Sequence, residues 1–131
     1  MTNKIKGILC DADFLIGLYV DKDSNHQKAT EIYSQFENFS ILNITFYEVA
    51  TVLSRLFDHQ IAKDTLKDIQ ELFTNVITFD QKLEESAFEL YYSYNKKNIS
   101  FFDCGCLITA QKNHYKIASF DKFYPKEMLV G

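Results

Sequence analysis

Short apolar runs alternate along the chain with longer segments in which apolar residues recur every three or four positions. The short runs are typical of buried β-strands, and the longer segments are typical of amphipathic helices. The predicted strands are Ile5–Cys10, Ser40–Ile44, Asn75–Phe79 and Lys116–Phe120, with Met128–Val130 as a candidate fifth strand. Because strands that alternate with helices pair in parallel, we expect an α/β fold in which helices cover both faces of a sheet of four to five strands.

Helices are expected between these strands, and several of them have recognisable start signals. Residues 14–20 follow the first strand, and Ser24 can cap the next helix. Thr45 and Glu48 have the spacing of a capping box at the start of the third helix. The remaining predicted helices are Ala62–Phe73, Lys82–Tyr94 behind the cap residue Asp80, and a segment that begins behind the cap residue Ser100.

The length and composition favour one globular domain over residues 1–131. Apolar residues make up 47% of the chain, which has only four glycines and one proline, so a disordered or low-complexity protein is excluded. No apolar stretch approaches the ~18 residues of a membrane span, and the Met1–Lys6 segment has no apolar core of the secretory type. We therefore expect a cytoplasmic protein with no membrane partner.

Three cysteines are an odd number for a chain without a secretory signal, which argues against a disulfide framework. We expect them to be reduced and to pack as small apolar residues. The alternative is a zinc site formed by Cys104, Cys106 and His114. That alternative lacks a CxxC pair and a fourth ligand at the usual spacing.

Four acidic residues stand where a strand-like run gives way to a turn or to the start of a helix, namely Asp11, Glu48, Asp103 and Asp121. The strand ends of one polarity share a crevice in an open α/β sheet, so these residues are expected to converge. Each pair of ionised carboxylates at ~4 Å costs about 4 kcal/mol at an effective dielectric constant of ~20. Such a group must take up protons or hold a cation, and oxygen ligands favour Mg²⁺ or Mn²⁺.

Each of these acids also has an ordinary structural explanation when it is taken alone. Asp11 could cap a helix, Glu48 and Asp103 could complement a helix dipole, and Asp121 could form a turn. Capping does not require four acids at the same edge of one sheet, however. The combination therefore favours a site, whereas Asp80, which has the same placement, is predicted to be only a cap.

The charge is unevenly distributed along the chain. A net charge of −4 disfavours passive binding of nucleic acid. Residues 96–131 nevertheless carry six lysines and only three acidic residues. This basic surplus flanks Asp103 and Asp121, although lysines of this kind can also serve only to solvate helix faces.

The four acids lie in four short segments, Ile8–Ile16, Tyr47–Val49, Phe102–Ala110 and Ala118–Lys122. These segments resemble the motifs of PIN domains, notably those of the VapC-type toxin ribonucleases. Their order, the 18-residue gap from Asp103 to Asp121 and the total length agree with the family, and the resemblance covers nearly the whole chain. It implies a three-layer α/β/α sandwich, Mg²⁺- or Mn²⁺-dependent endoribonuclease activity, a homodimer and an antitoxin partner.

By the same resemblance, Asp11, Glu48, Asp103 and Asp121 correspond to the four family carboxylates that bind the metal and carry out catalysis. Ser119 stands where the family has a Thr or Ser whose hydroxyl supports the site. Asp13 departs from the family pattern of Ser, Thr or Asn, and either adds a charge beside the site or caps the next helix, which we favour. Arg55 lies seven positions after Glu48, on roughly the same helix face, where it could clamp a phosphate or form a structural salt bridge.

The favoured function is hydrolysis of RNA phosphodiester bonds by a water that the bound metal orients and activates. One alternative is a haloacid-dehalogenase-like phosphohydrolase with Asp11 as nucleophile, although Phe14 replaces the Thr or Val of that motif. A second alternative is a catalytically silent PIN-fold binding module. Some of the aromatic residues on helix faces are expected at an interface, and the rest in the core; they are Tyr33, Phe36, Phe57, Tyr91, Tyr92 and Tyr94.

Overall fold

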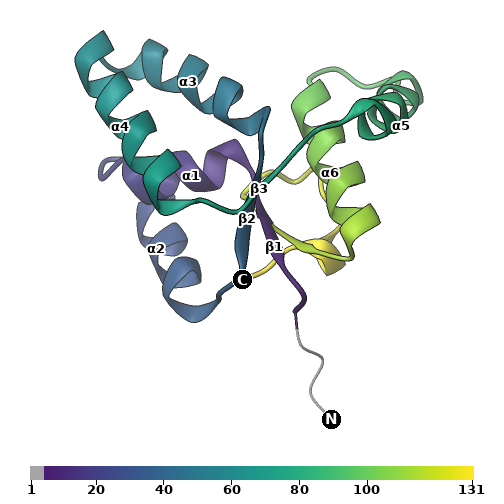
Figure 1. Ribbon diagram of the computed structural model, residues 1–131, viewed down its shortest axis with the longest axis horizontal. Helices are drawn as coiled ribbons and strands as arrows, with labels where there is room; N and C mark the ends of the chain where they lie inside the picture. Colours follow the sequence, from purple (N-terminus) through teal and green to yellow (C-terminus); the bar gives the residue numbers. More distant parts are fainter. Residues whose placement is uncertain (1–4) are drawn as a thin grey trace.

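The computed structural model describes residues 5–131 as an α/β/α sandwich around a parallel four-stranded sheet (Figure 1). The strands are β1 (Ile8–Cys10), β2 (Phe39–Leu42), β3 (Val76–Ile77) and β4 (Lys116–Ala118). Their order across the sheet is β3-β2-β1-β4, and every neighbouring pair is parallel. The prediction of an α/β fold with a parallel central sheet is confirmed.

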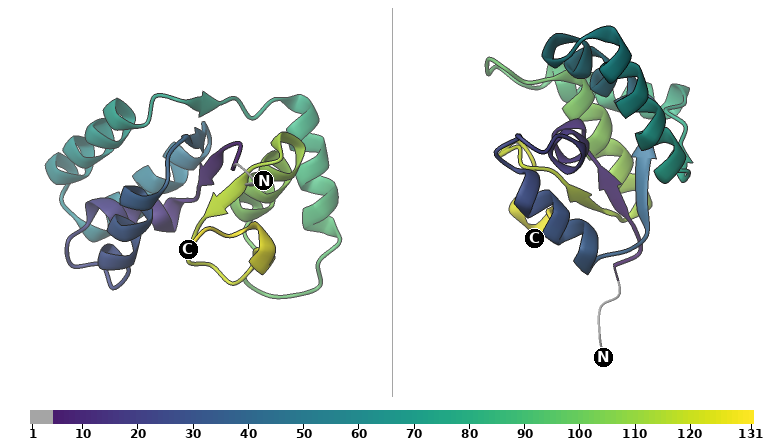
Figure 2. Two further views of the ribbon diagram at one scale, coloured as in Figure 1. Left: turned by 90° about the horizontal axis from the view of Figure 1, so that it is seen from below. Right: turned by 90° about the vertical axis from the view of Figure 1, so that its left-hand side faces the viewer.

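The helices divide between the two faces of the sheet (Figures 1 and 2). One face is covered by α1 (Ala12–Tyr19), α2 (His26–Gln35), α3 (Thr45–Leu56) and α4 (His59–Leu72), and the other by α5 (Gln81–Tyr92) and α6 (Phe101–Asn113). In the described residues, no helix is long and apolar enough to cross a membrane.

Strand β1 lies at the centre of the sheet and is completely buried. Ile8 and Cys10 pack into the cluster under α1–α4, whereas Leu9 packs into the cluster under α5 and α6. This alternation follows because successive side chains of a strand point to opposite faces. The end of β1 is therefore fixed from both sides, and the residue that follows it is Asp11.

The predicted helix starts are only partly correct. Asp80 and Ser100 cap α5 and α6 as expected, since their side chains accept hydrogen bonds from Leu83 N (3.0 Å) and Phe102 N (3.1 Å). The capping-box prediction for Thr45 is wrong, because its hydroxyl makes no capping hydrogen bond.

Two further predictions about local structure are corrected. Asn25, and not Ser24, precedes the first residue of α2. Residues 128–130 do not form a fifth strand, because Lys126–Met128 is a 3₁₀ helix. Within the described part of the chain, the segment after this helix forms a single parallel bridge, between Leu129 and Ile117, with Val130 N donating to Ile117 O (3.0 Å).

Candidate active site

The four predicted acids come from four separate elements. Asp11 follows β1 and is the N-cap of α1, Glu48 lies in the first turn of α3, and Asp103 lies in the first turn of α6. Asp121 follows β4 by three residues. Besides burial, the charges of Asp11, Asp121 and Glu48 raise the pKa of Asp103. Those of Asp11 and Asp121 raise the pKa of Glu48, and that of Asp121 raises the pKa of Asp11, so the four side chains lie within electrostatic reach of one another.

Asp11 is the most strongly held of these acids and is only 3% exposed. Its Oδ1 accepts a hydrogen bond from Ala12 N (2.8 Å), and its Oδ2 accepts from the Tyr124 hydroxyl (2.8 Å) and from Ser119 Oγ (3.2 Å). Burial raises the pKa of Asp11, and the charge of Asp121 adds to this, while the three hydrogen bonds lower it. The result is a buried carboxylate whose orientation is fixed by its donors.

Tyr124 is the site residue that the sequence did not reveal. It is buried, and its hydroxyl contacts both Asp11 Oδ2 and, at 3.4 Å, Asp103 Oδ1. It thus joins an acid that follows the central strand to an acid on α6. Its only signal in the sequence is that it stands three residues after Asp121, and an apolar core position explains a tyrosine there equally well.

Asp103 and Glu48 are acids that lack strong hydrogen-bond donors. Burial, and then the charges of Asp11, Asp121 and Glu48, raise the pKa of Asp103 to about 8. Burial, and then the charges of Asp11, Asp13 and Asp121, raise the pKa of Glu48 to about 7. Glu48 Oε1 is also buried without a hydrogen-bond partner among the described residues. An unpaired buried oxygen of this kind is costly, which indicates a site that lacks a positive partner.

The structure corrects the prediction that Asp13 caps α1, because Asp11 occupies the N-cap position. The carboxylate of Asp13 instead accepts hydrogen bonds from Ser119 Oγ (3.0 Å) and from Phe120 N (3.0 Å). Burial, and then the charge of Asp11, raise its pKa to about 7. Asp13 therefore stands beside the four acids as a fifth carboxyl group.

Ser119, which the family resemblance assigns a supporting role, connects these groups. Its hydroxyl lies within hydrogen-bond distance of Asp11 and Asp13, and it accepts a hydrogen bond from Asp121 N (3.0 Å). Since a hydroxyl carries one proton, Ser119 donates to only one of the two carboxylates at a time. Ser119 therefore links the carboxyl groups of Asp11 and Asp13 to the backbone at Asp121.

Arg55 is not brought into this group. It lies exposed in the last turn of α3, about 10 Å along the helix from Glu48. Within residues 5–131 it forms no ion pair, so the alternative of a structural salt bridge is not found there either.

The zinc alternative also fails. Cys104, Cys106 and Cys10 are buried free thiols. His114 follows the last residue of α6, about 12 Å along the helix from Cys106. Cys106 instead lies beside the candidate site, with its Sγ 3.9 Å from Asp11 Oδ1 and 3.7 Å from Thr45 Oγ1.

The donors of this site fit a hard divalent cation, because all of them are carboxylate oxygens and one of them is unpaired. In the part of the chain from residue 5 onward, no three His, Cys, Asp or Glu side chains already form a group that could hold a metal ion. The Tyr124 hydroxyl lies between Asp11 and Asp103. The carboxylates would therefore have to draw closer together around a cation.

The role of Tyr124 can be tested without any assumption about activity. We expect Tyr124→Phe to raise the pKa of Asp11 in the metal-free protein, because the lost hydrogen bond favours the ionised carboxylate. The phenyl ring keeps the packing, so the fold is expected to persist. The measurement is a carboxyl ¹³C NMR titration, with the exposed Tyr47→Phe as the control. An unchanged Asp11 titration would show that the hydroxyl does not hold this carboxylate.

Comparison with known proteins gives a consistent result for the fold. The family model described as PIN domain matches residues 8–126. The chain is similar to VapC20 of Mycobacterium tuberculosis, described as a sarcin–ricin-loop-cleaving toxin, with 23% identity over 95% of this chain and 97% of that chain and a TM-score of 0.82. It is also similar to a chain of a toxin–antitoxin complex from Klebsiella pneumoniae, with 22% identity, the same coverage and a TM-score of 0.65.

A third similar structure is VapBC2 of Rickettsia felis, solved with a DNA fragment of its promoter, with 13% identity over 87% of each chain and a TM-score of 0.65. At these identities the similarity shows a shared fold. A search of curated protein sequences found no match.

Proposed function

The chain belongs to the PIN domain family, and from this premise we propose that it is a metal-dependent endoribonuclease and the toxin of a type II toxin–antitoxin pair. The observation that carries the proposal is the convergence of Asp11, Glu48, Asp103 and Asp121 at one edge of the sheet, with the pKa of Asp103 raised to about 8 and that of Glu48 to about 7. Such a group is poorly suited to a purely structural role, because a cation or protons must offset its charge.

Asp11, Glu48, Asp103 and Asp121 would hold Mg²⁺ or Mn²⁺, which when bound supplies activation of a water and stabilisation of charge on the phosphate. Asp11 contributes a carboxylate that Ala12 N, Tyr124 and Ser119 hold in a fixed orientation. Glu48 contributes an oxygen that has no competing hydrogen bond among the described residues. Asp103, with a pKa of about 8, holds its proton at neutral pH until a cation favours the ionised form.

RNA as the substrate and an antitoxin as the partner are supported by the similar structures, which include a toxin that cleaves the sarcin–ricin loop and a toxin–antitoxin complex. A basic side chain of the antitoxin that enters the acidic group would neutralise the carboxylates. It would then compete with the metal, so the affinity of the partner is expected to fall as the Mg²⁺ concentration rises.

A homodimer is supported by exposed aromatic side chains on α5. Tyr92 is 75% exposed, and the neighbouring Phe88 and Tyr91 are also exposed. The other residues of the predicted aromatic surplus pack at least partly into the protein, as Tyr33 does against Phe39. Light scattering at micromolar concentration is expected to give twice the chain mass, and a monomer mass would remove the dimer from the proposal.

The nuclease proposal is tested by incubating the purified chain with RNA in Mg²⁺, in Mn²⁺ and in excess EDTA. We expect internal cleavage with either metal and none with EDTA. Intact RNA under all conditions would favour the catalytically silent binding module.

The phosphohydrolase alternative is not adopted, because the chain belongs to the PIN family and both oxygens of Asp11 already accept hydrogen bonds. Trapping of an aspartyl-phosphate at Asp11 would reverse that choice.

A further inference from the structure

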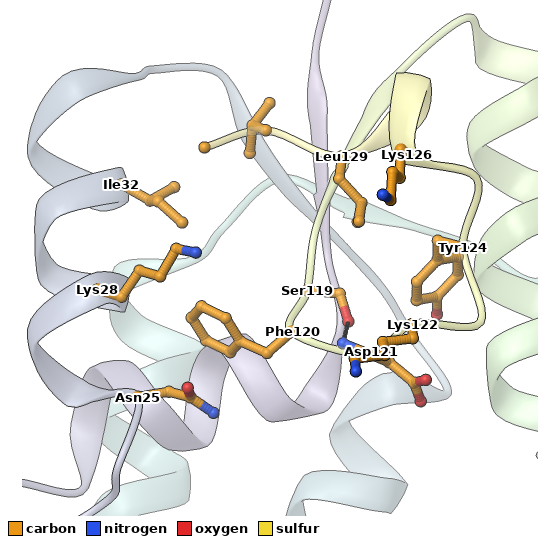
Figure 3. A pocket seen from close by; sticks show the side chains of 12 residues that line it. Asn25, Lys28, Ile32, Ser119, Phe120, Asp121, Lys122, Tyr124, Lys126 and Leu129 are labelled. Carbon is orange, nitrogen blue, oxygen red and sulfur yellow. Dashed lines mark hydrogen bonds between the residues drawn. The ribbon is translucent and has the colours of Figure 1, made fainter.

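A cavity of about 630 Å³ opens beside the carboxylates, between α2 and the segment that follows β4 (Figure 3). Ser119, Asp121 and Tyr124 line it, so the cavity shares its wall with the candidate active site. Its volume lies within the range of about 300–1,000 Å³ that is usual for sites of small ligands.

The rim of the cavity is basic. Lys28 comes from α2, while Lys122 and Lys126 come from the segment after β4, and Figure 3 shows Lys28 and Lys126 on opposite sides of the space. Within residues 5–131 none of these three lysines forms an ion pair. Among the described residues that line the cavity, Asp121 is the only one with an acidic side chain. In a chain of net charge −4, this is a local concentration of positive charge that suits an anion.

The floor of the cavity is apolar. Ile32 and Val130 are buried members of the core, and Phe120 packs against Phe14 with ring centroids 6.3 Å apart. An inorganic anion would gain nothing from such a floor. A nucleotide suits both the basic rim and the apolar floor. Its phosphate is anionic, and its base has an apolar face that packs against apolar and aromatic side chains.

We propose that this cavity is a substrate subsite that receives one unpaired nucleotide of the RNA strand, next to the phosphate that is cleaved. The lysines contact phosphate oxygens, and the base lies against Ile32 and Phe120. This inference rests on the proposed function, since the adjoining carboxylates define where the strand is cut. A base that enters the cavity must be free of its Watson–Crick partner, so these lysines would contact an unpaired stretch of the RNA strand.

The test compares two triple variants with the same change in charge. In the cavity variant Lys28, Lys122 and Lys126 are replaced by glutamine, and in the control variant Lys63, Lys67 and Lys112, which line no part of this cavity, are replaced in the same way. All six lysines are exposed, so both variants are expected to fold. Binding of an unpaired RNA oligonucleotide is measured in EDTA over a range of salt concentrations, and cleavage is measured in Mg²⁺.

We expect the cavity variant to bind the RNA at least about tenfold more weakly and to lower the slope of log K against log salt by about 2, since each phosphate contact on a single strand contributes about 0.7. Its KM should rise while kcat stays within about threefold of the wild-type value. The control variant should match the wild type in all of these, and a fully paired duplex should bind the wild type more weakly than the unpaired strand does.

The results distinguish the proposed nuclease activity from the proposed nucleotide subsite. If the wild type cleaves RNA but the cavity variant keeps the same salt slope and KM, or loses only the binding of a protein partner, the subsite is refuted and the nuclease stands. If the wild type binds RNA through these lysines but never cleaves it, the nuclease is refuted and the subsite stands as an RNA-binding site. If the wild type binds no RNA, both are refuted.

Discussion

The Asp11→Asn protein is expected to fold normally and to cleave RNA at least about 10³-fold more slowly than the wild-type protein. Asparagine can still cap α1, because Asn and Asp are comparable N-caps. Under the proposed function, the substitution removes the charge of a proposed metal ligand, a carboxylate that Tyr124, Ser119 and Ala12 hold in place. Metal-ion catalysis contributes several kcal/mol of transition-state stabilisation, and each 1.36 kcal/mol is a factor of ten in rate. The measurement is initial cleavage rate at saturating Mg²⁺, with circular dichroism to verify the fold.

Asp80→Asn is the matched control for this prediction. Asp80 also follows a strand and caps a helix, but it does not appear among the charges that shift the pKa of the site acids. Its replacement by Asn is expected to leave cleavage within about twofold, since the cap is retained. A well-folded Asp11→Asn protein that cleaves RNA as fast as Asp80→Asn would exclude Asp11 from the catalytic group.

The metal-free protein is expected to lose stability as the pH rises from about 4 to about 8. The pKa of Asp103 is raised from 3.8 to about 8, that of Glu48 from 4.5 to about 7 and that of Asp13 from 3.8 to about 7, in each case chiefly by burial. The folded state therefore binds these protons more tightly than the unfolded state does. This tighter proton binding contributes fully to the free energy of unfolding at pH values below the pKa values of the unfolded state. The contribution is lost as the pH rises through the pKa values of the folded state. With allowance for solvent screening, we expect a fall of about 2–3 kcal/mol in the free energy of unfolding.

The variant Asp103→Asn separates the contribution of Asp103 to this loss of stability from the contributions of the other acids. In EDTA at pH 8 the variant is expected to be about 1–2 kcal/mol more stable than the wild type, because it lacks a carboxyl group whose ionisation is opposed first by burial and then by the neighbouring charges. At pH 4 the two proteins should be equally stable. Urea unfolding at both pH values provides the measurement, and Glu89→Gln, at an exposed position on α5, is the control. A difference between variant and wild type that does not depend on pH would contradict the pKa assignment of Asp103.

Addition of Mg²⁺ at pH 8 should reverse the order of stability. A ligand that binds only the folded state stabilises it by RT ln(1 + [L]/Kd), and the wild type keeps the full set of carboxylates. The wild-type protein should therefore gain more from Mg²⁺ than Asp103→Asn does. Equal gains would indicate that Asp103 is not a ligand.

Four of the five candidate strands form as predicted, because each of them is specified by a short stretch of sequence. A buried strand such as Ile8–Cys10 is a local apolar run, and the acid that follows it is placed by the direction of the parallel sheet. The cap predicted at Thr45 was wrong because Ile44 occupies the N-cap position of α3 and no side-chain cap hydrogen bond forms there. The segment before α3 is held instead by a contact that is partly long-range. The side-chain oxygen of Asn43 accepts hydrogen bonds from Ile44 N (3.0 Å) and also from Phe79 N (2.8 Å), which lies 36 residues further along the chain.

Tyr124 and the role of Asp13 were missed for the same physical reason. The Tyr124 hydroxyl contacts Asp11 across 113 residues of sequence, and the Asp13 carboxylate contacts Phe120 N across 107. Both contacts arise only when the segment after β4 packs beside α1. A local reading of Asp13 instead favours a helix cap, because that is the commonest local use of an aspartate before an apolar helix.

The same long-range contacts set a time order for the protein during its synthesis. Asp11 is made early, but the hydroxyls that orient it belong to Ser119 and Tyr124. A chain growing at about 5–20 residues per second therefore spends several seconds with its first carboxylate present and its supporting donors still missing. Under the proposed function, a ribosome that translates this chain is not exposed to its nuclease activity until Tyr124 has emerged and β4 has paired with β1.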